Sequence, residues 1–345
     1  MSRFVAVCWL LAGGGAWGAD EPSATREFSI RGDRAYLAGE PIKLWGIRCG
    51  NALMSRGVTE RHVNALDAMK AHGINLIGAY IQGSNGGSPN PEAGFDGFRR
   101  DGRLKPEVAE RLEWLIREAD KRGMVVMVGV LSPRKDQDLY DEAAIRRAIE
   151  EAARFLESRK LRNVFVDLMH EYNNADRIDH ELLREPGGAD KKSKLAGWFR
   201  AIAPEIETGV CPSQDTGTDD QYPGMDVRII QKSMGIPSTG FVVNVELTRH
   251  DFYENDGIFS AAEIASMKKE WEQYRDAPNA AMLFHSAYVQ GISNKSGSAP
   301  NPEPGGYGTG PNDRGVRFFF DWLRDNVGPW EFPRHRSLKE GGVSR

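Results

Sequence analysis

Cysteine is scarce in this sequence: only Cys8, Cys49 and Cys211 occur among its 345 residues. Three thiols without a CxxC spacing exclude a dense disulfide framework and a compact cysteine-ligated metal site. Cys8 falls in the segment assigned below to an export signal, so two cysteines remain in the mature chain. A disulfide between Cys49 and Cys211 is open to an exported protein, but two separate buried thiols are the more typical state.

The chain also lacks a surplus of charge and, beyond its start, any long apolar run. The 45 Lys and Arg residues are balanced by 49 Asp and Glu residues, which gives a net charge of −4. This balance argues against a nucleic-acid partner and against a polybasic membrane surface. No later segment is apolar over the roughly 20 residues that a membrane helix needs. Neither a repeat nor a low-complexity linker divides the chain, so we expect one catalytic domain over residues 19–345.

The first 18 residues have the pattern of a secretory signal peptide. Arg3 supplies a short positive start, residues 4–12 (FVAVCWLLA) form the apolar run, and Ala16 and Gly18 are small residues at the positions that a signal peptidase reads. The apolar run is too short for a membrane anchor. We therefore predict cleavage after Gly18 and a secreted or periplasmic protein.

Short apolar runs alternate with amphipathic helical segments along most of the chain. Runs without polar alternation are typical of parallel strands that are covered on both faces. They occupy residues 42–48, 74–81, 124–131, 163–170, 207–211, 227–231, 241–246 and 281–288, after a hairpin over residues 28–37. Eight strands with intervening helices predict an α/β fold, the (β/α)₈ or TIM barrel.

The helices between these runs are predicted from apolar spacing and from start and stop residues. One begins near Thr59 and another at Pro106; the remaining helical segments cover residues 140–160, 194–203 and 316–323. The connections after strands five and six are short, because a right-handed crossover normally needs about a dozen residues. We therefore expect trimmed or absent helices at these two places.

Catalytic groups of such barrels lie at the carboxyl ends of the strands. Glu171 directly follows the fourth strand, and Glu246 ends the seventh. Burying a carboxylate there is costly unless it serves a site or pairs with a cation. Two carboxylates across one barrel mouth suit glycosidic bond cleavage, in which one gives a proton to the leaving oxygen and the other attacks or activates water. The same rule selects Arg48, His170, Asp215, His285 and Tyr288 as further candidates.

Three passages resemble clan A glycoside hydrolases, especially the family 5 cellulase-like enzymes. They are the entry FSIRGDRAYLAGEPIKLWGIR and the approaches ALDAMKAHGINLIGAYI and LEWLIREADKRGMVVMVGV to strands two and three. The resemblance implies that Glu171 is the acid/base and Glu246 the nucleophile. The family has Asn before its acid/base, where this chain has His170, and a Trp at the end of strand eight, where MLFHSAYVQG offers His285 and Tyr288.

Further side chains are candidates for substrate binding, although some of them could instead have a purely structural role. Arg48 could hydrogen-bond a catalytic carboxylate and keep it ionised, or form an ordinary ion pair within the barrel. Tyr80, Tyr172 and Tyr288 could offer stacking faces to sugar rings, or pack in the core. His170 can donate or accept a hydrogen bond in place of the family's Asn.

The favoured interpretation is an exported retaining glycoside hydrolase that cleaves β-linked poly- or oligosaccharides without a cofactor. An alternative is a carbohydrate-binding barrel that has lost turnover, for which the absent Asn and Trp are the best argument. Less favoured is a metal-dependent hydrolase, because HxH and HExxH spacings are missing. Its candidate ligands are Asp167, His170, Glu171, His250 and His285. The sequence does not indicate an oligomeric state.

Overall fold

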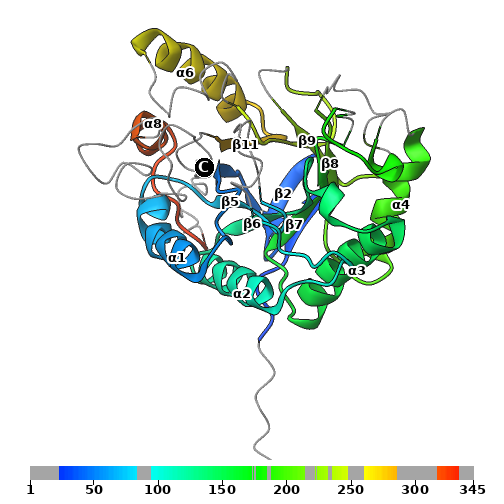
Figure 1. The fold of residues 1–345 in the computed structure, drawn as a ribbon. Helices are drawn as coiled ribbons and strands as arrows, with labels where there is room; N and C mark the ends of the chain where they lie inside the picture. Colours follow the sequence, from blue (N-terminus) through cyan, green and yellow to red (C-terminus); the bar gives the residue numbers. More distant parts are fainter. Residues whose placement is uncertain are drawn as a thin grey trace, which may run out of the picture.

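A closed barrel of eight parallel strands forms the centre of the molecule (Figure 1). The computed structural model describes residues 23–83, 95–172, 174, 176–184, 188–213, 222, 224–231, 235–247, 260–285 and 317–333. The barrel strands are β4 (Trp45–Arg48), β5 (Leu76–Tyr80), β6 (Val125–Leu131), β7 (Val164–His170), β8 (Thr208–Cys211), β9 (Val227–Ile230), β10 (Phe241–Asn244) and β11 (Ala280–Phe284). Because β11 pairs with β4, the sheet has no free edge. The predicted (β/α)₈ barrel is confirmed.

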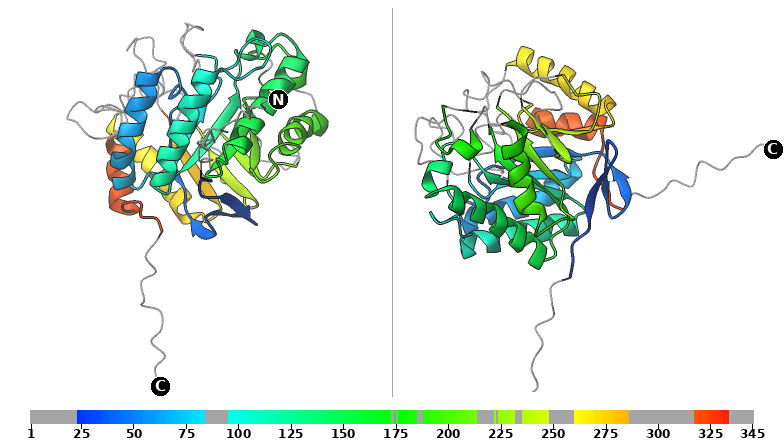
Figure 2. Two further views of the ribbon diagram at one scale, coloured as in Figure 1. Left: turned by 90° about the horizontal axis from the view of Figure 1, so that it is seen from below. Right: turned by 90° about the vertical axis from the view of Figure 1, so that its right-hand side faces the viewer.

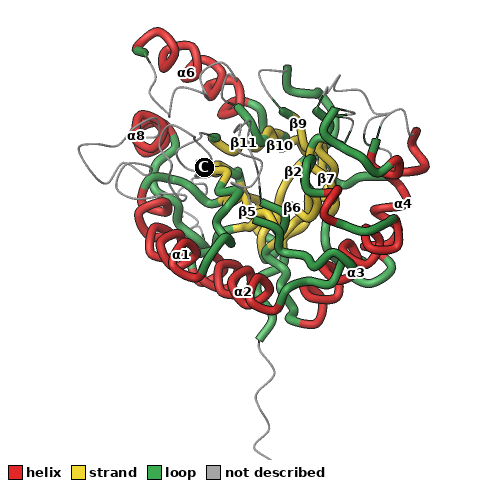
Figure 3. Tube along the Cα trace, in the orientation of Figure 1, coloured by secondary structure: helices red, strands yellow, loops and turns green. Residues whose placement is uncertain are grey.

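Helices surround the strands, as the red outer ring around the yellow strands in Figure 3 shows. They are α1 (Arg56–Ala71), α2 (Pro106–Lys121), α3 (Glu142–Ser158), α4 (Gly188–Arg200), α6 (Ala261–Asp276) and α8 (Arg317–Asn326), with short 3₁₀ turns η2 (Asp136–Asp138) and η3 (Glu181–Leu183). The parts of the β8–β9 and β9–β10 connections that the structure describes contain no helix, in line with the trimmed helices expected there. Among the described residues, no helix combines the length and apolarity needed to cross a membrane.

Helix ends follow local capping more closely than apolar spacing. Helix α1 begins at Arg56, three residues before the predicted Thr59, because the side chain of Ser55 accepts a hydrogen bond from the amide of Val58. Helix α6, which the sequence analysis did not identify, begins with a reciprocal capping box between Ser260 and Glu263. The apolar face predicted for α2, from Val108 to Ala119, is buried.

A three-stranded antiparallel sheet precedes the barrel and lies beside it in the right-hand view of Figure 2. Its strands are β1 (Phe28–Arg31), β2 (Arg34–Leu37) and β3 (Glu40–Ile42), so the run predicted as 42–48 is divided between β3 and β4. The amide of Phe28 donates to the carbonyl of Arg162 before β7, and the amide of Ile30 donates to the carboxylate of Glu207 before β8. The sheet therefore binds the amino ends of the barrel strands and leaves the carboxyl ends to the candidate site.

Candidate active site

Glu246 lies two residues beyond β10 and is buried against a cation from β4, which only β11 separates from β10 in the barrel. Arg48, the last residue of β4, donates from Nη1 to Glu246 Oε1, and its side chain is only 1% exposed. Burial by itself raises the pKa of Glu246, but Arg48, together with His285 and His170, lowers that pKa well below its usual range. Glu246 is therefore a buried, ionised carboxylate, and Arg48 makes the contact predicted for it with a candidate catalytic residue.

The turn after β10 is shaped by Asn244, a fully buried amide. Its Oδ1 accepts from the amide of Glu246 at 3.0 Å, and its Nδ2 donates to the hydroxyl of Tyr274 on α6 at 2.9 Å. An Asn side chain that accepts from the backbone two residues on is a common way to close a tight turn. Asn244 thus fixes the backbone that carries Glu246.

His170, the last residue of β7, completes the cluster around Glu246. Arg48 Nη2 donates to His170 Nε2 at 2.9 Å, and the same ring nitrogen lies 3.5 Å from Glu246 Oε1 and 3.4 Å from the amide nitrogen of Gln231. A guanidinium only donates, so its contact with Nε2 leaves a ring proton on Nδ1. Burial and Arg48 lower the pKa of His170, but Tyr80, Cys211 and Asp167 outweigh them and raise that pKa well above its usual value, which keeps this proton on the ring. The ring nitrogen nearest Glu246 is therefore already engaged within the protein.

Glu171 directly follows His170 and has an unusual backbone. Its φ of 53° lies in the left-handed region, which few residues other than glycine adopt and which costs about 1–2 kcal/mol. Its Oε2 accepts from Arg177 Nη1 at 2.9 Å, and the Arg177 side chain is 30% exposed. Strained backbone of this kind is concentrated at functional sites.

The two glutamates that end strands four and seven of the barrel meet at one place. Single ligand atoms of His170, Glu171 and Glu246 all lie within 4.8 Å of one another. Sequence analysis paired Glu171 with Glu246 from their strand-end positions alone. The structure brings these two carboxylates together, with different cations on each: Arg48 on a barrel strand and Arg177 on the loop after β7.

Of the remaining candidates for substrate binding, His285 lies near Glu246, whereas Tyr172 and Tyr80 are buried. His285 follows β11 and is buried close enough to Glu246 to lower the pKa of that carboxyl. Tyr172 is 4% exposed and belongs to the hydrophobic core, so its predicted contact with sugar gains no support from its position. Tyr80 is fully buried, with the guanidinium carbon of Arg48 5.1 Å from its ring centroid. Tyr288 lies outside the described residues.

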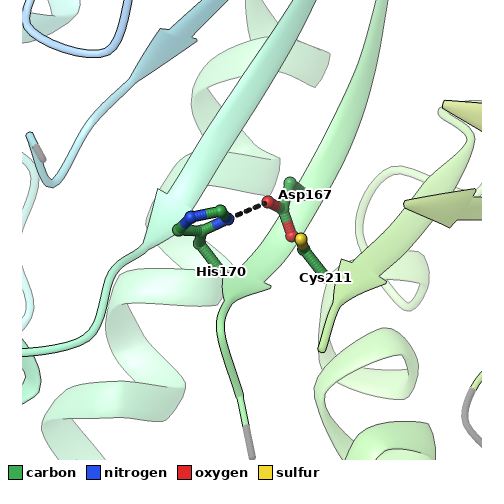
Figure 4. Close-up of side chains that lie close together, drawn as sticks. All are labelled: Asp167, His170 and Cys211. Atoms are coloured by element: carbon green, nitrogen blue, oxygen red, sulfur yellow. Dashed lines mark ion pairs between the residues drawn. The ribbon is translucent and has the colours of Figure 1, made fainter. Parts of the chain in front are cut away.

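Asp167 and Cys211 lie next to His170 on the interior of the barrel (Figure 4). Asp167 Oδ2 is 3.6 Å from His170 Nδ1, and ligand atoms of all three residues lie within 4.8 Å of one another. Burial raises the pKa of the Cys211 thiol to about 11, so the sulfur is protonated at neutral pH. Cys49 and Cys211 are buried and form no disulfide with each other, as predicted.

Within the described part of the chain, two groups of residues lie close enough to hold a metal ion, and both include His170. In this arrangement Nε2 faces the Arg48 guanidinium and Nδ1 carries a proton, so neither ring nitrogen has a free lone pair for a metal. A cation would also lie beside the Arg48 guanidinium. His250, another ligand of the metal-dependent alternative, lies outside the described residues. The geometry therefore gives no reason to assign a metal site.

Sequence reasoning did not identify Arg177, Gln231 and Asn244 as site residues. Arg177 and Gln231 carry no local signal, because their contacts depend on how loops and strands far apart in sequence meet. Asn244 could have been found, since a polar residue inside the run FVVNVE stands two positions before the candidate glutamate. Asp167 appeared only as a metal candidate, although a carboxylate in the otherwise apolar strand VFVDLM is itself a signal.

Comparison with known proteins supports the fold through structure alone. No protein-family model and no curated protein sequence matches this chain. A β-glucanase from Saccharophagus degradans, solved in complex with cellotetraose, matches with a TM-score of 0.57 at 12% identity over 90% of this chain and 99% of its own.

Two further solved structures are similar over comparable lengths. An endocellulase from Pyrococcus horikoshii, also with cellotetraose, gives a TM-score of 0.55 at 13% identity over 88% of this chain and 99% of its own. A β-mannanase from the blue mussel Mytilus edulis gives 0.51 at 12% identity over 90% and 99% of the two chains. Glycoside hydrolases of family 5 are among the similar structures. The predicted resemblance to the family 5 barrel is thus confirmed as a likeness of fold.

Proposed function

We propose that this protein is a retaining glycoside hydrolase that acts on β-linked poly- or oligosaccharides. The observation that carries the proposal is the approach of Glu171 and Glu246, whose carboxylate oxygens lie within 4.8 Å at the carboxyl end of the barrel. Retaining enzymes keep their two carboxyl groups about 5–5.5 Å apart, whereas inverting enzymes need about 6.5–9.5 Å to admit a water molecule. The separation supports attack by one carboxylate on the sugar itself.

The surroundings of the two carboxylates support a division of labour. Arg48 is fixed on β4 and almost fully buried, so Glu246 stays ionised and serves as the nucleophile. Arg177 is part of a loop and partly exposed, so the leaving oxygen of a substrate can replace it as the partner of Glu171. Glu171 then protonates that oxygen and later removes a proton from the attacking water.

The substrate class rests on the solved relatives and on the chemistry of the site. The similar structures include enzymes named as a β-glucanase, an endocellulase and a β-mannanase. We therefore propose a β-glucan or a β-mannan as the substrate and, from the signal-like residues 1–18, action outside the cytoplasm. The proposed chemistry requires no metal or other cofactor.

Kinetics on activated aryl β-glucosides and β-mannosides test the proposal. Glu246→Ala should abolish turnover, because no glycosyl-enzyme can form. Glu171→Ala should retain the first step on substrates with good leaving groups, accumulate glycosyl-enzyme, and respond to added azide, which replaces the missing base-activated water.

Glu110→Ala is the matched control, since Glu110 is 72% exposed on α2 and should leave the rate unchanged. Equal and azide-insensitive losses in the two active-site variants would contradict the assigned roles. Binding of cellotetraose without turnover by the wild type would instead support a carbohydrate-binding barrel. Loss of activity on dialysis against a chelator, restored by added metal, would support a metal-dependent hydrolase.

A further inference from the structure

Asp167 is a fully buried carboxylate whose place on β7 the proposed reaction does not use. Its relative exposure is 0%, and neither Oδ1 nor Oδ2 has a hydrogen-bond partner among the described residues. Burying a carboxylate without hydrogen bonds costs several kcal/mol, so a nearby positive or proton-bearing group must offset the cost. The proton-bearing group that the structure places against it is Nδ1 of His170, 3.6 Å from Oδ2.

The contacts of His170 separate cleanly between its two nitrogens. Arg48, Gln231 and Glu246 approach Nε2. Asp167 approaches Nδ1 (Figure 4). The groups around the ring are Arg48 from β4, Tyr80 from β5, Asp167 from β7, Cys211 from β8, Gln231 after β9 and Glu246 after β10. Of these, Asp167 is the anion on the Nδ1 side.

A carboxylate beside one ring nitrogen decides which tautomer a histidine adopts. An anion beside Nδ1 favours the proton on that nitrogen and leaves the lone pair on Nε2. That lone pair is what Arg48 Nη2 requires, and the other arm of the same guanidinium donates to Glu246. With the opposite tautomer, an N–H would point at Arg48 and the two donors would repel each other. A chain of contacts therefore leads from Asp167 through His170 and Arg48 to Glu246.

We propose that Asp167 is a positioning residue that holds the proton on Nδ1 of His170 and, through the ring, the place of Arg48 on the nucleophile Glu246. The inference rests on the proposed function for its catalytic consequence, but the tautomer itself is a property of the folded protein. In this account His170 positions Arg48, and through Arg48 the carboxylate of Glu246. It does not bind the sugar hydroxyl that the Asn of family 5 enzymes would hold.

Nitrogen-15 NMR of the imidazole side chains tests the tautomer directly, without any turnover. The resonances of His170, one of seven histidines, are identified by their loss in His170→Gln. We expect the wild type at pH 7 to carry a proton on Nδ1, and Asp167→Asn to lose this preference. A wild-type ring that is protonated on Nε2 alone would overturn the proposal even if no variant folds.

A double-mutant cycle tests the catalytic consequence. Asp167→Asn should lower kcat by roughly 10²-fold with little change in KM, as expected when a reacting group is displaced by about 1 Å. In the His170→Gln background, the same change should cost no more than about twofold, because Asp167 acts through His170. An equal loss in both backgrounds would overturn the proposal.

Asp226→Asn is the matched control for loss of a structural carboxylate. Asp226 precedes β9 and accepts from Thr208 and Arg200. The control should lower Tm without altering the tautomer of His170. If the wild type cleaves no β-glycoside while the Nδ1–H tautomer is found, the proposed function fails and the role of Asp167 in holding the ring stands.

Discussion

At the residue scale, Arg48 and Glu246 form a buried ion pair at the candidate site. The guanidinium and the carboxylate come from strands that are distant in sequence, and both are nearly excluded from solvent. A buried pair of this kind adds little net stability when intact, but loss of one partner costs about 3–5 kcal/mol because the other charge is left without compensation. The charged state of Glu246 therefore depends on the presence of Arg48.

Arg48→Met should therefore raise the pKa of Glu246, because burial then acts without its main opposing charge. The acid limb of kcat/KM, which reports the ionised nucleophile, should move to higher pH, and unfolding should become easier by about 3–5 kcal/mol. Measurements of kcat/KM against pH and urea unfolding check both effects. Arg154→Met, a change at an exposed pair on α3, should alter stability by no more than about 0.5 kcal/mol.

The wild type should show the corresponding dependence of stability on pH. The pKa of Glu246 is lower in the folded protein than its unfolded value of about 4.3, so the contribution of the pair is fully present above that pH. It is lost as the pH falls from about 4.3 through the folded-state pKa. Urea unfolding at a series of pH values should show this decline in the wild type. An unchanged decline in Glu246→Gln would contradict the assignment to Glu246.

How far the site can be predicted from sequence also depends on the residue. Glu171 and Glu246 could be assigned because apolar runs mark where strands end, and strand ends converge in a barrel. The partners of these glutamates could not all be assigned in this way. Arg48 was a strand-end candidate, whereas Arg177 reaches Glu171 through a left-handed turn that no local pattern indicates.

At the scale of elements, a glycine on one strand leaves space for an aromatic ring of the neighbouring strand that contacts the site. Gly129 on β6 lies beside β5, and a Cβ atom at this position would overlap with the ring of Tyr80. That ring in turn stands edge-on to His170, with the two centroids 5.7 Å apart, and beneath Arg48. Because Gly129 has no side chain, the Tyr80 ring fits beside β6. There it contacts both His170 and Arg48.

Gly129→Ala should destabilise the protein by about 1–3 kcal/mol, the usual effect of overpacking a core. It should also reduce kcat, because the displaced Tyr80 ring would push on His170 and Arg48. Urea unfolding and steady-state kinetics measure the two effects. Gly57→Ala in α1, where an added Cβ meets nothing within 4 Å, should instead be neutral or stabilising by up to about 1 kcal/mol. Equal behaviour of the two variants would contradict this reasoning.

The elements themselves were largely predictable, and the errors have local causes. Buried parallel strands read as unbroken apolar runs, which fixed all eight barrel strands within a few residues. Helix α6 was missed because its buried face is sparse, with only Met267, Trp271 and Tyr274 fully covered. Its start is instead set by the capping box of Ser260 and Glu263, a short signal that apolar periodicity does not detect.

At the scale of the whole molecule, the described contacts of the chain begin after the predicted signal. Phe28 packs on Phe165 of β7, with ring centroids 5.3 Å apart, and also near Phe241 of β10. Removal of residues 1–18 should therefore leave Tm unchanged within about 1 °C, whereas removal through Arg31 deletes β1 and should lower it by several degrees. Thermal unfolding of both truncations is the measurement. A non-cooperative transition in the shorter deletion would contradict the predicted cleavage.

Closure of the barrel by β4 and β11 has a consequence for how the chain reaches its final state. Trp45 and Met282 are partners in the same ladder although 237 positions separate them. Until residue 284 has been synthesised, β4 presents an unpaired row of amides and carbonyls to any strand that it meets. Pairing over such a sequence distance is slow. A chain interrupted before β11 is thus exposed to aggregation along the free edge of β4.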